Sequence, residues 1–98
     1  MSNIVEEYVA RLDAKVKNIL KGTAKLVIKD EGFVFLDDTG AEITDEAREA
    51  DVVLIASDKV FRKILDGSQN PALAFASGKL KVEGSPMRAL KVSDILTA

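Results

Sequence analysis

The sequence of 98 residues contains no histidine, no cysteine and no tryptophan. Without histidine and cysteine it lacks the serine–histidine and cysteine–histidine arrangements of hydrolases and the usual nitrogen and sulfur ligands of zinc. Catalysis would have to rest on carboxylates, lysines, Tyr8 or hydroxyl groups. We therefore expect a protein that is not an enzyme and that uses no cofactor or metal, and the missing cysteines exclude a disulfide framework.

Other binding motifs are also missing. The six glycines form neither a GxGxxG nor a GxxxxGK phosphate loop. Residues 37–42 are acidic, but the calcium-loop spacing places Phe35 where aspartate is required, so a solvated turn is the better interpretation. With a net charge of −2 and only four phenylalanines and one tyrosine, the chain is not expected to bind nucleic acid.

Long apolar runs are absent too, so we expect no transmembrane segment. The N-terminal residues carry acids where a signal peptide needs basic residues followed by an apolar core, and a cytoplasmic location is expected. The charge is uneven along the chain: residues 30–58 carry ten acidic side chains and one basic one, Arg48.

Hydrophobic periodicity predicts the secondary structure. Apolar residues at three- and four-residue spacing predict a helix over residues 3–20. Alternating and β-branched residues predict strands over residues 23–29, 33–36, 41–44, 50–56 and 79–83. Ser57 and Asn70 are suited to cap helices over 59–66 and 71–77, and Pro86 is suited to open a last helix.

This order of elements favours an α+β fold in one domain over residues 1–98. We expect a sheet of about five strands, mainly antiparallel, with helices covering one face and an apolar cavity between the two layers.

Residues 68–92 combine several of these signals in a fixed order. Asn70-Pro71 opens a short helix that contains Ala74-Phe75, the strand lies within Gly78-Lys79-Leu80-Lys81-Val82-Glu83-Gly84, and Ala89-Leu90-Lys91 lies on the last helix. In this order and spacing the segment resembles the sterol carrier protein 2 family. Ala50-Asp51, Ser57-Asp58 and Gly67 extend the resemblance, which is looser over residues 20–40.

Two departures from the family pattern bear on the interpretation. Family members often carry a polar residue, frequently threonine, at the outward positions that are Val53 and Ile55 here. Many also carry aspartate or asparagine after the glycine that corresponds to Gly84, where this chain has Ser85-Pro86. The first departure concerns assembly, and the second concerns the start of the helix that borders the family's tunnel.

The resemblance implies a lipid held in an apolar tunnel between the covered sheet face and the helices. The residues expected on its wall are Leu26, Ile28, Phe33, Phe35, Leu54, Phe61, Leu65, Phe75, Leu80, Val82, Met87 and Leu90. Arg88 and Lys91 are near neighbours on the last helix and are candidates to bind a carboxylate or phosphate head group. The alternative for these two residues is a solvated basic face.

The function that follows is the binding, and possible transfer, of a fatty acid, acyl-CoA, sterol or other lipid without catalysis. Ten methylenes that leave water contribute about 8 kcal/mol before association costs. The alternative is a non-catalytic structural or regulatory interaction module that keeps the same fold with a collapsed tunnel. A carboxylate- or lysine-based enzyme is the third option.

A second sheet face raises the question of assembly. If Leu26, Phe33, Phe35 and Leu54 face the helices, the alternation of strands places five aliphatic residues on the other face. These residues are Val27, Val34, Leu36, Val53 and Ile55. An exposed apolar patch of this kind predicts a homodimer, unless the first helix or a loop covers it within the monomer.

Overall fold

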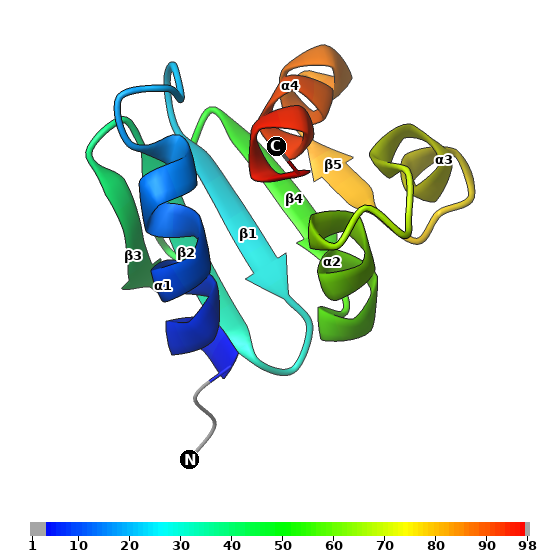
Figure 1. The fold of residues 1–98 in the computed structure, drawn as a ribbon, viewed down its shortest axis with the longest axis horizontal. Coiled ribbons are helices and arrows are strands. Elements are labelled where there is room, and N and C mark those ends of the chain that lie inside the picture. Colours follow the sequence, from blue (N-terminus) through cyan, green and yellow to red (C-terminus); the bar gives the residue numbers. More distant parts are fainter. Residues whose placement is uncertain (1–3, 98) are drawn as a thin grey trace.

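A five-stranded sheet organises the protein, in the strand order β3-β2-β1-β4-β5 (Figure 1). The computed structural model describes residues 4–97. Along the chain the elements are α1 (Ile4–Val16), β1 (Ala24–Ile28), β2 (Gly32–Asp37), β3 (Gly40–Thr44), β4 (Val52–Ala56), α2 (Asp58–Leu65), α3 (Pro71–Ala76), β5 (Lys81–Glu83) and α4 (Pro86–Thr97). The predicted α+β fold is confirmed.

The sheet is mainly antiparallel, as predicted. The β1–β2, β2–β3 and β4–β5 pairs are antiparallel, and only β1 and β4 run parallel. A parallel pair needs a crossover connection, so residues 45–51 must carry the chain from β3, at one edge of the sheet, across β2 and β1 to β4.

Capping residues set the helix starts that the sequence predicts. The Ser57 hydroxyl accepts a hydrogen bond from the Val60 N–H, and the Asn70 side chain accepts from the N–H groups of Ala72 and Leu73. These bonds satisfy amide groups that have no partner within the helix. Pro71 lies in the first turn of α3, where its missing N–H costs nothing.

The first helix ends earlier than the periodicity predicts. It stops at Val16 rather than at Leu20, because Asn18 adopts a left-handed backbone with φ of 62°. The Asn18 N–H donates to the Asp38 carbonyl oxygen in the β2–β3 turn. As a result Leu20 is buried while Ile19 projects outward. The predicted start at residue 3 lies outside the described residues.

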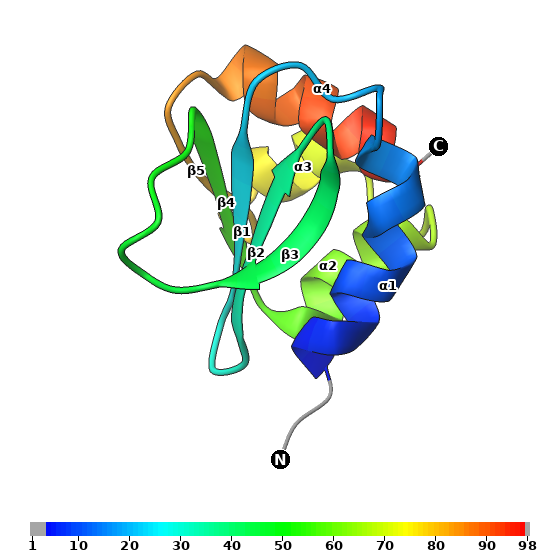
Figure 2. The ribbon, with the colours of Figure 1, turned by 90° about the vertical axis from the view of Figure 1, so that its left-hand side faces the viewer.

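The helices cover one face of the sheet, and the core fills the space between them (Figure 2). Leu26 of β1 pairs with Val34 of β2 and Leu54 of β4, and all three are fully buried. The helices contribute Leu12, Val16, Phe61, Ile64 and Leu96 to the same continuous cluster. No helix among residues 4–97 combines the length and apolar character that a membrane crossing requires.

The predicted faces of β2 are wrong. Val34 and Leu36 face the helices and are completely buried, whereas Phe33 and Phe35 lie on the opposite face. The register explains the reversal: Val34 lies opposite Leu26, so the two side chains share a face. Phe33 and Phe35 therefore do not contribute to a wall between sheet and helices, and Val34 and Leu36 do not contribute to an exposed patch.

The crossover loop, residues 45–51, partly covers the second sheet face. The Lys25 ammonium donates to the carbonyl oxygens of Glu46 and Arg48 at 3.0 and 2.9 Å. The Arg48 guanidinium carbon lies 3.7 Å from the centroid of the Phe35 ring, a cation–π contact that helps to bury this ring. Val27, Val53 and Ile55 remain half-buried on this face.

Candidate functional site

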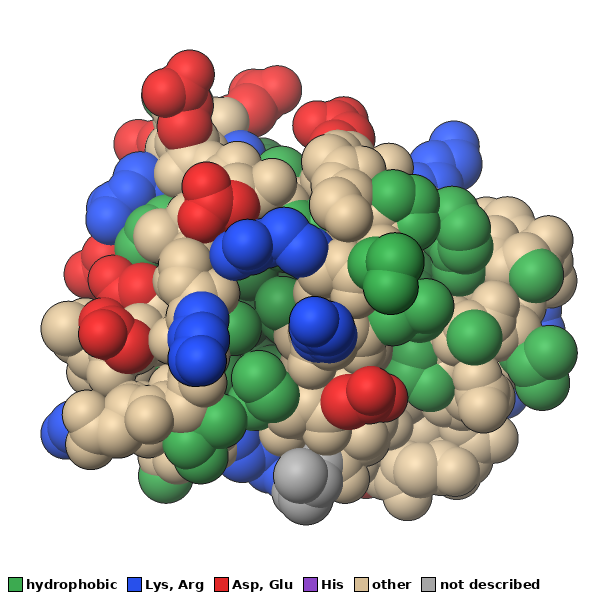
Figure 3. All heavy atoms as spheres, turned by 90° about the horizontal axis from the view of Figure 1, so that it is seen from above, with side chains coloured by type: hydrophobic (Ala, Val, Ile, Leu, Met, Phe, Trp, Pro, Cys, Tyr) green, Lys and Arg blue, Asp and Glu red, His purple; other side chains and the backbone are tan. Residues whose placement is uncertain are grey.

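The most suitable apolar site is a groove beside α4. It has a volume of about 260 Å³, and it lies between α4 and the segment that joins α1 to β1. Its lining residues, which define the α4 groove, are Ile19, Leu20, Lys21, Arg88, Lys91, Val92 and Ile95. Figure 3, which looks down on this end of the molecule, shows a hollow lined by hydrophobic side chains with basic side chains around it.

Helical spacing brings the α4 residues of the groove together. Arg88, Lys91, Val92 and Ile95 occupy positions i, i+3, i+4 and i+7 of the helix, so they share one side of it. Val92 is buried and forms part of the floor, while Ile95 is half-buried. The groove therefore offers aliphatic surface at its base and two cations at its rim.

Arg88 is held in place by the neighbouring loop. Its Nη2 atom donates to the Lys21 carbonyl oxygen at 3.1 Å and lies 3.7 Å from Asp51 Oδ2. Asp51 is fixed in turn, because its carboxylate accepts the Thr23 N–H and its own N–H donates to the Thr23 hydroxyl. A Cβ atom at Gly22 would overlap Arg88 Nη2, so glycine at this position allows the contact.

The predicted site residues fall into several groups in the structure. Six of them belong to the packed core: Leu26, Ile28, Leu54, Phe61, Leu65 and Leu80. Val82 and Leu90 are half-buried. Phe75 and Met87 are exposed, and Met87 at 72% exposure is not the wall of an enclosed cavity. Arg88 and Lys91 are brought together at the rim of the α4 groove.

Sequence reasoning missed five lining residues of the groove. Val92 and Ile95 follow Arg88 at helical spacing, so the periodicity of the last helix was a signal for both. Ile19, Leu20 and Lys21 belong to a different segment, and their place opposite α4 depends on the chain reversal at Asn18. The sequence alone gives no signal for that approach.

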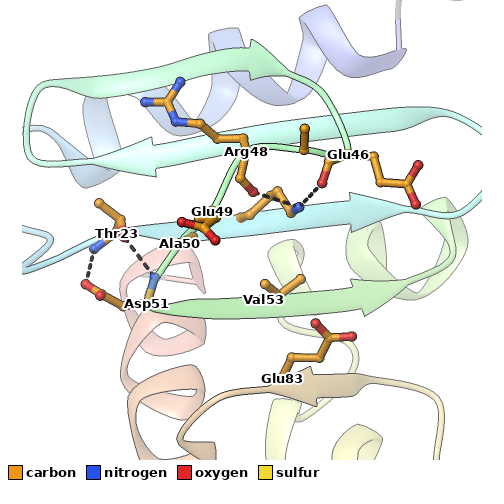
Figure 4. A pocket seen from close by; sticks show the side chains of 10 residues that line it. Thr23, Glu46, Arg48, Glu49, Ala50, Asp51, Val53 and Glu83 are labelled. Atoms are coloured by element: carbon orange, nitrogen blue, oxygen red, sulfur yellow. Dashed lines mark hydrogen bonds between the residues drawn. The ribbon is translucent and has the colours of Figure 1, made fainter.

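A larger pocket lies between the crossover loop and the second sheet face. It has a volume of about 530 Å³, and Figure 4 shows Arg48 and Glu49 on the loop above the strands that carry Val53 and Glu83. Carboxylates dominate its lining, with Glu46, Glu49, Asp51 and Glu83, and Val53 is its only large aliphatic side chain. Such a lining is unsuited to a lipid chain. Residues 4–97 contain no group of three or more carboxylates arranged to hold a metal ion.

A polar cluster joins α1 to α2. The Tyr8 hydroxyl donates to Asp58 Oδ1 at 2.7 Å, and Arg62 donates both to Asp58 Oδ1 and to Glu7 Oε2. Burial and the hydrogen bond to Asp58 raise the pKa of Tyr8, so the phenol remains protonated and is no candidate base. The hydrogen bonds to Glu7 and Asp58 raise the pKa of Arg62. The adjoining hollow has only about 20 Å³, which suits a structural role.

Comparison with known proteins agrees with this fold. The model of the SCP-2 sterol transfer family matches residues 4–97. The chain belongs to this family. It is 34% identical over 71 residues to the fatty acid-binding protein of Yarrowia lipolytica, an alignment that covers 72% of this chain and 51% of that protein. It is also 34% identical over 73 residues to the rat hydroxysteroid dehydrogenase-like protein 2, covering 70% of this chain but 14% of that protein.

Solved structures share the fold at lower identity. The sterol carrier protein 2 of Aedes aegypti, in a complex with palmitate, has a TM-score of 0.75 and 18% identity, covering 98% of this chain and 96% of that one. The apo form of the Yarrowia lipolytica sterol carrier protein 2 has a TM-score of 0.71 and 24% identity, covering 96% and 84%. These similarities establish the fold. The chain matches only about half of its yeast relative's length and a small part of the dehydrogenase-like protein.

Proposed function

We propose that this protein binds, and transfers between surfaces, a hydrophobic ligand such as a fatty acid, an acyl-CoA or a sterol, without catalysing a reaction. The observation that carries the proposal is the α4 groove, where aliphatic side chains form the base and Arg88 and Lys91 lie at the rim. Family membership and the fatty acid-binding relative support the same ligand class. The absence of histidine and cysteine from the sequence supports a non-catalytic role.

The volume of the groove limits how the ligand binds. Ligand sites commonly measure about 300–1,000 Å³, so a groove of about 260 Å³ holds only part of a long chain. The remainder would need space that opens when α4 moves away from the core. One observation favours the alternative function, an interaction module with a collapsed tunnel. Leu26, Leu54 and Phe61 fill the space between sheet and helices where the resemblance implies a tunnel.

Mass spectrometry of lipid extracted from the purified protein separates these two functions. The proposal predicts lipid at a substantial molar ratio, and binding of a fluorescent fatty acid to the delipidated protein. A protein that carries no lipid and does not respond to the fatty acid would establish the interaction module instead. A cytoplasmic location and the absence of nucleic acid binding remain predictions from the sequence.

The head-group role of Arg88 and Lys91 is part of this proposal. Replacing both residues, as Arg88→Glu with Lys91→Glu, is expected to weaken fatty acid binding by about tenfold or more, because each cation that faces a carboxylate contributes about 1 kcal/mol. Binding of a neutral sterol is expected to change much less. Competition titrations with both ligands measure this difference. Equal losses for the two ligands would assign Arg88 and Lys91 to a solvated basic face.

We also propose that the protein forms a homodimer through the second sheet face. Four half-buried apolar residues of this face form the surface that supports the dimer: Val27, Phe33, Val53 and Ile55. Val34 and Leu36 lie in the core and do not belong to it. Sedimentation of the wild type at tens of micromolar, beside a variant with Val53→Glu and Ile55→Lys, tests the dimer. We expect a dimeric wild type and a monomeric variant. A monomeric wild type would overturn the dimer and indicate that the crossover loop already shields this face from water within one molecule.

A further inference from the structure

A bridge of polar side chains closes the seam between α1 and α2. This α1–α2 bridge consists of Glu7, Tyr8 and Arg11 on α1, Asp58 and Arg62 on α2, and Asp66 at the end of α2. Its two ion pairs between the helices, Arg62–Glu7 at 2.7 Å and Arg11–Asp66 at 2.9 Å, are 41–60% exposed to water. An exposed ion pair changes an equilibrium by no more than about fivefold. The bridge therefore joins the helices and still opens readily.

Contacts on the far side of α1 fix this helix to the sheet. Val5 packs against Gly32 of β2, where an added Cβ atom would lie only 2.7 Å from the valine methyl group. Asp13 Oδ1 accepts the Ala41 N–H of β3 at 2.9 Å. The end of α2 is less confined, since an added Cβ atom at Gly67 would meet no atom within 4 Å. A widening of the seam must therefore come from movement of α2.

The last helix depends on both helices that the bridge joins. α4 contacts α1 and α2, and its last turn lies between them (Figure 1). Leu96 in this turn is buried in the same core cluster as Leu12 of α1 and Phe61 of α2. Leu20 and Val92 belong both to this cluster and to the α4 groove. Separation of α1 and α2 would thus loosen α4 and extend the groove into the space beneath it.

We propose that the α1–α2 bridge is a gate for long acyl chains. While it is closed, the α4 groove holds a short apolar ligand, and when it opens, the rest of a long chain enters beneath α4. The proposal rests on the proposed function, since it extends the ligand space of the same groove. A long chain in this space holds the bridge open, so its apparent affinity rises with the fraction of protein that is already open. Weakening the bridge then strengthens the binding of a long ligand, whereas loss of a merely structural contact would not.

The dependence on chain length tests the gate. Asp66→Arg removes one ion pair and places a second cation beside Arg11. We expect this variant to bind palmitate up to about fivefold more tightly than the wild type does, because one exposed ion pair no longer opposes opening. Octanoate, which the groove accommodates without the gate, is expected to bind equally to both proteins. Adding Arg11→Asp restores the pair with its charges exchanged and is expected to restore the palmitate affinity of the wild type.

Glu42→Arg is the matched control. Glu42 pairs with Arg48 at 3.3 Å, and its side chain is 58% exposed, the same fraction as that of Asp66. The substitution changes the net charge equally, but this pair joins β3 to the crossover loop instead of joining two helices. We expect no gain in palmitate affinity. An equal gain in the two variants, an equal gain for the two fatty acids, or no gain for Asp66→Arg would overturn the gate.

Hydrogen exchange of the ligand-free protein separates the gate from lipid binding. Asp66→Arg is expected to speed amide exchange up to about fivefold in α2 and in the last turn of α4, while α1 and β2 stay protected as in the wild type. Exchange that rises equally in α1 and α2, or in neither, overturns the gate and leaves the proposed function intact if fatty acid still binds. Faster exchange confined to α2 and α4, in a protein that binds neither fatty acid, supports the opening of the bridge and overturns the proposed function.

Discussion

Leu54→Ala is expected to lower the free energy of unfolding by about 3–5 kcal/mol, a large part of the stability of a domain of this size. Leu54 lies on β4 near the centre of the sheet, paired with Leu26 and Val82, and is 1% exposed. Truncating a side chain in a packed core leaves a cavity in addition to the lost transfer free energy. Beside an open tunnel the same truncation would only enlarge an existing space, at a much lower cost.

Urea denaturation of the wild type and the variant measures the difference. Leu73→Ala is the matched control, because Leu73 undergoes the same chemical change on α3 but is exposed. Its effect is expected to stay within about 0.5 kcal/mol. A cost below about 1 kcal/mol for Leu54→Ala would indicate loose space between sheet and helices, and it would move the candidate ligand site from the α4 groove into the interior.

Where the sequence contains an unambiguous local signal, the prediction agrees with the structure. Ser57 and Asn70-Pro71 carry cap chemistry that depends on nearby residues alone, and both cap the helices that were expected. Leu26 and Leu54 alternate with Lys25 and Val53, and both face the helices as predicted. In these cases the residue type and its immediate neighbours in the sequence are enough to determine where the side chain lies.

The predictions fail where distant segments decide the outcome. All four residues of the predicted strand 33–36 are apolar, so alternation does not distinguish its two faces, and the prediction that Phe33 and Phe35 face the helices is wrong. Their true environment depends on Arg48, which the crossover loop places against the Phe35 ring, and on Lys25 of β1, which lies near the Phe33 ring and donates to a carbonyl oxygen of that loop. The groove is a similar case, since Ile19 and Ile95 meet only in the folded chain.

Ile95→Trp is expected to reduce fatty acid affinity by about 50-fold while the protein remains folded. Ile95 is half-buried and lines the α4 groove of about 260 Å³. An indole at this position occupies space that the acyl chain would use. If about three methylenes are excluded from the groove, the lost contribution is about 2.4 kcal/mol, which corresponds to the expected change in affinity. Titration of a fluorescent fatty acid, with circular dichroism as the check on folding, gives the result.

Ile43→Trp is the control, because it introduces the same side chain at a 55% exposed position on the edge strand β3. It is expected to leave affinity unchanged. The two substitutions at Ile95 and Leu54 together locate the ligand. A site in the α4 groove predicts a large loss of affinity for Ile95→Trp and a large loss of stability for Leu54→Ala. A tunnel beneath the helices predicts the reverse for each, because Leu54 would then border an open space and Ile95 would lie outside the ligand's path.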